Sequence, residues 1–343
     1  MAYTTINKST DHFFTKLWTG TNAGETISGI PFQPDFNWTK QRTGTQDHVL
    51  VDAVRGVEKT LFSNATDTEY TLSDGLTAWT SDGFVHGTNN RYCEASNTFV
   101  SWSWKAGTTS GIAGSPSITP TGYSFNTTNG FSIIKWTGTG ANGTLPHGLG
   151  VKPSMIITKD LGGTSNWCVY HKSLGATLHL NLNSTSAEST NTNRWNDTEP
   201  TTTVFSVGTD AETNASGRDM VAYCFAEKSG YSNFGKYIGN GSTNGAFVYT
   251  GFKPSFVMWK KSSGADGWHM LDKTRDPYNV AFHRIEADST SAEYTSADWC
   301  DYLSNGIKFR NTGGGVNGNG DTYIYMAFGQ TIVGSNNTPA TAR

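Results

Sequence analysis

The amino-acid sequence predicts an all-β fold made of three related β-sandwich-like modules in tandem, a pseudo-threefold repeat. Only 15% of the 343 residues are charged, while 39 are Gly, 18 are Phe, 14 are Tyr and 11 are Trp. This balance favours many short strands joined by tight turns over helix. The second observation is that one series of landmarks occurs three times in the same order.

Each copy contains a fixed proline, and a lysine follows it six residues later. The prolines are Pro34, Pro153 and Pro254, and the lysines are Lys40, Lys159 and Lys260. Eighteen residues after the prolines come Asp52, His171 and Asp272. The prolines lie about 100–120 residues apart, whereas solenoid and propeller units span roughly 20–50 residues. Each copy is therefore of domain size, which leaves open three linked modules or one pseudo-threefold body.

Period-two alternation predicts the strands. After each proline, large residues and the lysine share one face of the segments 36–40, 155–159 and 256–260. Each copy closes on an aromatic strand, at 100–104, 221–225 and 324–328. These closing strands carry no charge on either face, which is typical of central strands. The residues expected in the core are Trp102, Trp104, Tyr223, Phe225, Met326 and Phe328.

Turn-forming residues separate the strands. Glycine-rich segments at 19–24, 138–143 and 239–245 occupy the same place in each copy and predict hairpin loops. Helix is scarce, and single helical turns are expected directly after Asp52, His171 and Asp272.

These signals divide the chain into six segments. Residues 106–130 are rich in Gly, Ser, Thr and Pro, a composition that predicts a surface linker or crossover strand. The last residues are expected to be disordered by composition. The segments are an N-terminal extension 1–14, module 15–105, linker 106–130, module 131–230, module 231–330 and tail 331–343.

Charge and cysteine content exclude several classes of protein. The formal net charge of −3 is not accompanied by a basic stripe, so no nucleic-acid partner is expected. No apolar run is long enough to span a bilayer, so no membrane insertion is expected. The N-terminus lacks the apolar region of a signal peptide, which predicts synthesis in a cytosol. The four cysteines, Cys93, Cys168, Cys224 and Cys300, lack zinc-type spacing and are expected to be reduced.

No motif predicts catalysis. Gly138, Gly140 and Gly143 match a dinucleotide-binding pattern, but no helix follows and the other copies do not keep the spacing, so a turn is favoured. The eight histidines form no metal-binding motif, and no nucleophile elbow occurs. We therefore expect a protein that is not an enzyme and that holds no metal or cofactor.

Two further sets of residues recur. Glutamates Glu69, Glu188 and Glu293 each follow an Asn or Asp by five residues, and with the recurring lysines they predict one structural ion pair per module. Tryptophans Trp79, Trp195 and Trp299 follow the glutamates in polar surroundings. Such rings could stack on sugars as glycan contacts, or they could close the edge of each module's own core.

Four runs carry a family resemblance. The opening Met-Ala-Tyr-Thr-Thr-Ile-Asn-Lys-Ser-Thr-Asp-His-Phe and the runs at 29–40, 144–159 and 251–260 resemble repeat proteins common in tailed bacteriophages, especially marine ones. The resemblance covers roughly residues 1–330 and implies a virion or tail-fibre-like structural protein, with no catalytic motif to transfer. The first copy departs from the pattern at Asn37 and Thr39, which predicts an edge-like strand there.

The resemblance and the absence of catalytic motifs together predict a phage virion structural protein, a tail-fibre, tail-associated or host-adhesion component acting by binding and assembly. The expected location is the virion, with synthesis and assembly in the host bacterial cytoplasm. Expected partners are other virion proteins, a host surface glycan and further copies in a homotrimer or other homo-oligomer. Three repeats in one chain could instead imitate a trimer. The alternatives are a capsid decoration or head-fibre protein and a glycan depolymerase, the latter disfavoured because no carboxylate pair stands out.

Overall fold

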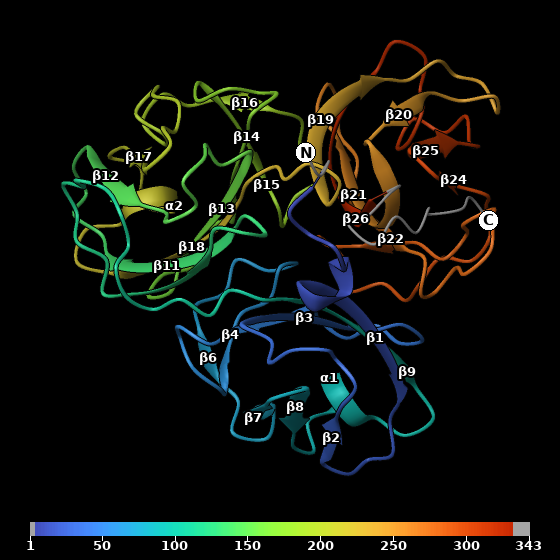
Figure 1. The fold of residues 1–343 in the computed structure, drawn as a ribbon, viewed down its shortest axis with the longest axis horizontal. Helices are drawn as coiled ribbons and strands as arrows, with labels where there is room; N and C mark the ends of the chain where they lie inside the picture. Colours follow the sequence, from blue (N-terminus) through green and yellow to red (C-terminus); the bar gives the residue numbers. More distant parts are fainter. Residues whose placement is uncertain (1–3, 332–343) are drawn as a thin grey trace.

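The computed structural model describes residues 4–331 and is all-β, with 41% strand and 3% helix. Its helical elements are single turns: η1 (Ser9–Asp11), α1 (Asn90–Cys93) and α2 (Ala211–Asn214). The strands form antiparallel sheets arranged in three lobes around a common centre (Figure 1).

Three large sheets form the framework. The first sheet has the order β1 (Phe13–Thr19), β9 (Thr98–Trp104), β3 (Phe36–Gln41) and β4 (Val49–Asp52). The second has the order β10 (Gly122–Asn126), β11 (Phe131–Thr137), β18 (Asp219–Phe225), β13 (Met155–Asp160), β14 (Cys168–His171), β15 (Leu178–Asn181) and β16 (Ser189–Thr190). The third has the order β19 (Ser232–Ile238), β26 (Thr322–Thr331), β21 (Phe252–Lys261), β22 (Trp268–Asp272) and β23 (Ile285–Glu286).

A small sheet lies against the outer face of each large one. These are β2 (Glu25–Ile27), β8 (Gly83–His86) and β7 (Leu76–Thr80); β12 (Gly143–Pro146) and β17 (Val204–Val207); and β20 (Phe247–Tyr249), β25 (Gly306–Phe309) and β24 (Cys300–Leu303). A pair of short strands, β5 (Lys59–Thr60) and β6 (Tyr70–Thr71), completes the set. A separate hydrophobic cluster fills each layer between a large and a small sheet, so each lobe is sandwich-like.

The closing strands are central, as the sequence predicts. β9, β18 and β26 each lie between two partners, and the six residues expected in the core are at most 3% exposed. The pairing has the same register in each sheet. The residue two positions after the proline faces the last large aromatic of the closing strand, in the pairs Phe36 with Trp104, Met155 with Phe225, and Phe256 with Phe328.

The inner faces of the three large sheets share one hydrophobic core. At its centre, Trp104, Phe225 and Phe328 form a nearly equilateral triangle of rings. Their centroids are 6.0 Å apart for Trp104 and Phe225, 5.8 Å for Trp104 and Phe328, and 6.1 Å for Phe225 and Phe328. The aromatic positions of the closing strands therefore pack on one another across the lobes, as well as within their own sheets.

The prediction that the strand after Pro34 is edge-like is wrong. β3 lies between β9 and β4, and every residue in it is buried. Its two polar residues satisfy each other and the neighbouring strand: Thr39 Oγ1 donates to Asn37 Oδ1, and Asn37 Nδ2 donates to Ser103 Oγ. Buried polar groups are tolerated when they are hydrogen-bonded in this way.

The segment 106–130 was expected to be a surface linker or crossover strand, and it includes a strand. It contains β10, which extends the second sheet beside β11, and it buries Ile118 in the second lobe's own cluster. The turns predicted after Asp52, His171 and Asp272 are present, whereas the short helices α1 and α2 were not anticipated. The four cysteines are free and buried, as expected. Apart from Thr331, the last residue of β26, the predicted tail lies outside the described residues.

Candidate functional site

The recurring lysines lie where a loop of one large sheet contacts the next sheet, contacts that we call junctions. Each lysine is buried, and burial lowers its pKa to about 8 although nearby acids oppose the shift. Each ammonium group donates to backbone carbonyl oxygens, one of which lies across a junction. These cross-junction pairs are Lys159 with Thr66 O, Lys260 with Thr185 O and Lys40 with Thr290 O.

The recurring glutamates lie at the same junctions, but the predicted lysine–glutamate ion pairs are wrong. The buried ammonium groups donate to carbonyl oxygens. Each glutamate contributes to its junction through a hydrogen bond from its backbone NH group. The NH groups donate to the residue two positions after the lysine, in the pairs Glu69 with Leu161 O, Glu188 with Ser262 O and Glu293 with Arg42 O. The three junctions thus close a ring from the first sheet to the second, the third and back.

The first–second junction contains a buried triad of Asp52, Arg55 and Glu69. Arg55 Nε lies 2.5 Å from Asp52 Oδ2, and Arg55 Nη1 lies 3.0 Å from Glu69 Oε2. The Tyr223 hydroxyl, from the second sheet, donates to Asp52 Oδ2 at 2.8 Å. Burial alone would lower the pKa of Arg55, but Asp52, Tyr223 and Glu69 outweigh it and raise the pKa. The arginine is therefore a permanently charged structural cross-link.

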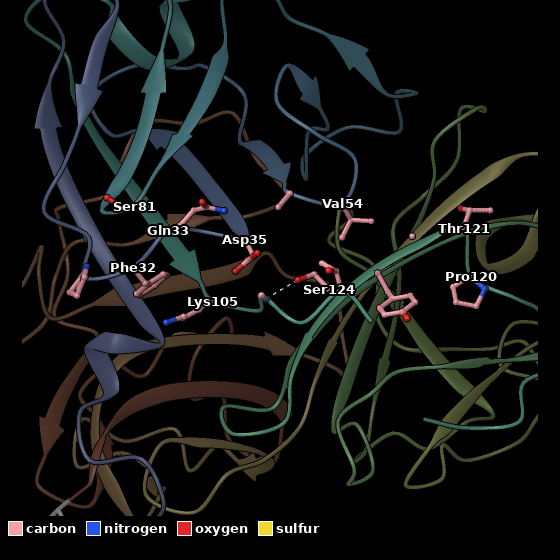
Figure 2. A pocket seen from close by; sticks show the side chains of 15 residues that line it. Phe32, Gln33, Asp35, Val54, Ser81, Lys105, Pro120, Thr121 and Ser124 are labelled. Atoms are coloured by element: carbon pink, nitrogen blue, oxygen red, sulfur yellow. Dashed lines mark hydrogen bonds between the residues drawn. The ribbon is translucent and has the colours of Figure 1, made fainter. Parts of the chain in front are cut away.

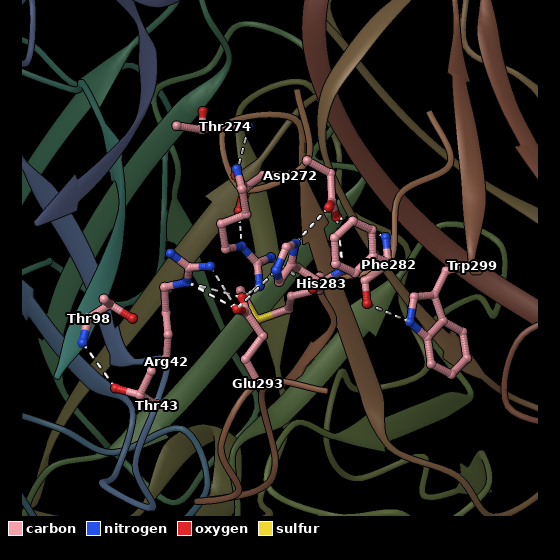
Figure 3. Close-up of polar contacts among 12 residues, drawn as sticks. Arg42, Thr43, Thr98, Asp272, Thr274, Phe282, His283, Glu293 and Trp299 are labelled. Atoms are coloured by element: carbon pink, nitrogen blue, oxygen red, sulfur yellow. Dashed lines mark hydrogen bonds and ion pairs between the residues drawn. The ribbon is translucent and has the colours of Figure 1, made fainter. Parts of the chain in front are cut away.

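The third–first junction repeats this arrangement (Figure 3). Arg275 Nε lies 2.6 Å from Asp272 Oδ2, and Arg275 Nη1 lies 2.8 Å from Glu293 Oε1. Trp102 Nε1, from the first sheet, donates to Asp272 Oδ2 at 3.0 Å. Arg42 adds a second ion pair to Glu293, and the two arginines lower the pKa of this carboxyl although burial acts the other way.

The second–third junction has no such triad. His171 and Leu174 replace the aspartate and arginine, and Met326 replaces the aromatic donor. His171 Nδ1 accepts from Ser173 N, and Nε2 faces Tyr325 O at 3.1 Å, so the ring is neutral and donates through Nε2. Burial lowers its pKa to about 4. The second–third junction therefore lacks the aspartate, and its facing side chain, Met326, has no proton to donate.

Sequence reasoning missed a third repeated contact. The ring nitrogens of Trp167, Trp268 and His48 reach the backbone oxygens of Phe62, Asn181 and Glu286 across the three junctions, at 2.9, 3.0 and 2.9 Å respectively. Each of these rings follows its proline by 14 residues. That constant spacing was the available signal, and the change from Trp to His obscured it.

Two interpretations were open for the recurring tryptophans, a glycan contact or closure of a local core, and their burial agrees with the second. Trp195 and Trp299 are 2% and 9% exposed and belong to the sandwich clusters of the second and third lobes. Trp79 is half-buried and packs against the cluster of the first lobe. All three close the edge of a local core. Pro34, Pro153 and Pro254 are likewise buried, each at the start of the strand that pairs with its closing strand.

A cleft of about 870 Å³ lies between the first lobe and the segment 106–130. Figure 2 shows Phe32, Gln33 and Asp35 on one wall, with Pro120 and Thr121 on the other. Asp35 is 7% exposed, and its carboxylate accepts from Ala106 N at 2.8 Å. Burial raises its pKa to about 6, against the opposing effect of the Ala106 NH.

Within residues 4–331 no group of three or more His, Cys, Asp and Glu side chains could hold a metal ion. The same part of the chain has no helix that is long and apolar enough to cross a membrane.

A family model described as a domain of unknown function, DUF7483, matches residues 8–331. The chain belongs to the DUF7483 family. Neither the search of curated proteins nor the search of solved structures finds a match. The DUF7483 match runs from before β1 to the last residue of β26, so the family is defined over the three large sheets together.

Proposed function

We propose that this DUF7483 protein is a rigid, non-catalytic structural component of a bacteriophage particle, in a tail fibre or another host-adhesion assembly. It acts by presenting surface and by binding other virion proteins. The proposal treats the three sheets as copies of one module, covering residues 15–105, 131–230 and 231–330, fused into one pseudo-threefold body. The phage assignment comes from the sequence resemblance.

The triangle of Trp104, Phe225 and Phe328 is the observation that supports this proposal most strongly. Each ring occupies the same register position of its closing strand and contacts the other two. A core built at the meeting point of three sheets makes each lobe depend on the others. Such mutual dependence suits a particle component that must remain folded outside the cell.

The fate of the recurring ionisable residues also supports a structural role. The lysines donate to backbone oxygens, and Arg55 and Arg275 join carboxylates within single junctions. An active site would need a perturbed group that is free to meet substrate, whereas these groups are engaged in holding the sheets together. The threefold pattern of the chain therefore serves architecture in this proposal.

Purified phage particles provide the test. We expect mass spectrometry to find the protein in particles from a density gradient, and immunogold labelling to place it on the tail or its fibres. Gold confined to the head would replace the tail assignment with the decoration or head-fibre alternative. Absence of the protein from particles would contradict the proposal, and sugar release from host polysaccharide above a buffer control would establish the depolymerase alternative.

A second measurement addresses assembly. Light scattering of the purified chain distinguishes a homotrimer or other oligomer from a single chain that imitates a trimer. We expect a homo-oligomer, because multivalent attachment gains affinity from several weak contacts.

A further inference from the structure

The cleft beside Asp35 breaks the equivalence of the three sheets. The residue after the recurring proline is Asp35 in the first sheet, Ser154 in the second and Ser255 in the third. The backbone is used in the same way at all three positions, because the carbonyl oxygens accept from Ala53 N, Lys172 N and Lys273 N at 2.8, 2.8 and 3.0 Å. Only the side chain differs, so the shared backbone contact does not require a carboxylate there.

Asp35 is costly for the fold. The residue is buried, and within residues 4–331 it forms no ion pair, although the charge of Lys105 acts on its carboxylate. The Ala106 NH donates to it, and the Ser124 hydroxyl also interacts with it. A carboxylate offers about four acceptor positions, so part of its capacity remains for a group in the cleft. The two equivalent positions hold serine, so the buried carboxylate at Asp35 is best explained by a role in binding a ligand.

The cleft lining indicates the chemistry of that ligand. Asp35 and Lys105 supply one negative and one positive charge, and Gln33 supplies an amide. The half-buried Tyr123 and Val54 add an aromatic ring and an apolar patch. A phosphate group would favour several cations or an arginine fork, and a wholly apolar ligand would leave the polar groups unsatisfied. The lining therefore fits a neutral molecule with many hydroxyl groups and an apolar ring face.

We propose that this cleft binds a neutral saccharide, with Asp35, Lys105 and Gln33 hydrogen-bonding its hydroxyl groups and Tyr123 packing on a ring face. The volume of about 870 Å³ lies within the usual range of small-ligand sites. Within residues 4–331 the site is formed once, because the segment 106–130 supplies one wall and no equivalent segment joins the second and third sheets. The inference rests on the proposed function, since a host-adhesion protein needs a contact for surface glycans.

Saturation-transfer NMR on the full chain tests the site with glucose, galactose, N-acetylglucosamine and maltose as neutral probes. Glucuronate and inorganic phosphate serve as anionic probes. We expect saturable binding of at least one neutral saccharide, weakened tenfold or more by Asp35→Ser and by Tyr123→Leu. Ser154→Ala, at the equivalent position of the second sheet, should leave binding unchanged. A thermal melt at pH 7 should show Asp35→Ser fully folded at the temperature of the NMR experiment, so its loss of binding would not reflect unfolding.

Three results would overturn the inference: no binding of any neutral probe, unchanged binding in Asp35→Ser, or stronger binding of an anionic probe. The test is separate from that of the virion role. Absence of the protein from particles would contradict the virion role and leave saccharide binding in place. A particle protein that binds no saccharide would contradict this site alone.

Discussion

The first–second and second–third junctions use the same positions with different chemistry. In the first, the buried Asp52–Arg55 pair receives a hydrogen bond from Tyr223. In the second, neutral His171 bonds to a backbone oxygen beside Met326. The lysine-to-carbonyl and glutamate-NH contacts are common to both. Backbone contacts are therefore the part that the two junctions have in common. The buried ion pair is present only where the facing side chain donates a hydrogen bond to it.

The largest expected effect concerns the core that all junctions share. Phe225→Ala should lower the free energy of unfolding by about 3–5 kcal/mol, because it removes one ring of the central triangle and leaves a cavity. Denaturant unfolding followed by tryptophan fluorescence measures the change. Phe247→Ala, at a ring that is 46% exposed, is the matched control and should change stability by no more than about 0.5 kcal/mol. A loss below about 1 kcal/mol for Phe225→Ala would show that the triangle is peripheral to stability.

A similar loss is expected when one junction's charges are unbalanced. Arg55→Leu should destabilise the protein by about 3–5 kcal/mol, because it leaves the Asp52 carboxylate buried without its partner. The control at the equivalent position of the second–third junction is Leu174→Met, which should cost less than about 1.5 kcal/mol. Equal losses in the two variants, measured by the same denaturant titration, would remove the distinction between the junctions.

The pH dependence of stability should separate the junctions as well. The folded pKa of His171 is about 4, below its ordinary value of 6.5, so the unfolded chain binds more protons between these values. Stability from this residue is therefore complete above pH 6.5 and is lost as the pH falls toward 4, by about 3 kcal/mol in total. His171→Asn should flatten the slope of unfolding free energy over that window. An unchanged slope would mean that His171 is protonated in the folded protein.

The smallest net effect is expected when one junction is converted into the other. The triple variant Asp52→His, Arg55→Leu and Tyr223→Met gives the first–second junction the residues of the second–third. Its stability should lie within about 2 kcal/mol of wild type, because replacing a whole buried ion pair is far less costly than breaking one. If the triple variant is no more stable than Arg55→Leu alone, the two chemistries are not interchangeable.

The sequence predicted the strands more completely than the contacts between them. Alternation and the absence of charge placed Trp102, Tyr223 and Met326 on central strands, which the sheet order confirms. The role of Lys159 could not be predicted, because three of its four hydrogen-bond acceptors are backbone oxygens, which carry no sequence signal. The burial of Asn37 was missed for another reason. Its hydrogen-bond partner Ser103 lies on a strand that is distant in the sequence, so the polar side chain indicated an edge strand.

The cleft was missed for a related reason. The composition of the segment 106–130 predicted a surface linker or crossover strand. Its strand β10 and the residues around it supply one wall of the cleft. Asp35 directly follows the first recurring proline, and its difference from Ser154 and Ser255 was the signal that could have identified it. Recurring landmarks reveal what the three segments share, whereas a site of this kind depends on where one segment differs.

Hydrogen exchange measured by mass spectrometry tests the shared core most directly. In the wild-type protein, the amides of β9, β18 and β26 should open with one common free energy, because their aromatic residues meet in one triangle. Phe225→Ala should reduce protection in all three strands by the same amount, although the substitution lies only in β18. Loss of protection confined to β18 and its own sheet, with β9 and β26 unchanged, would contradict the shared core and show three independent modules.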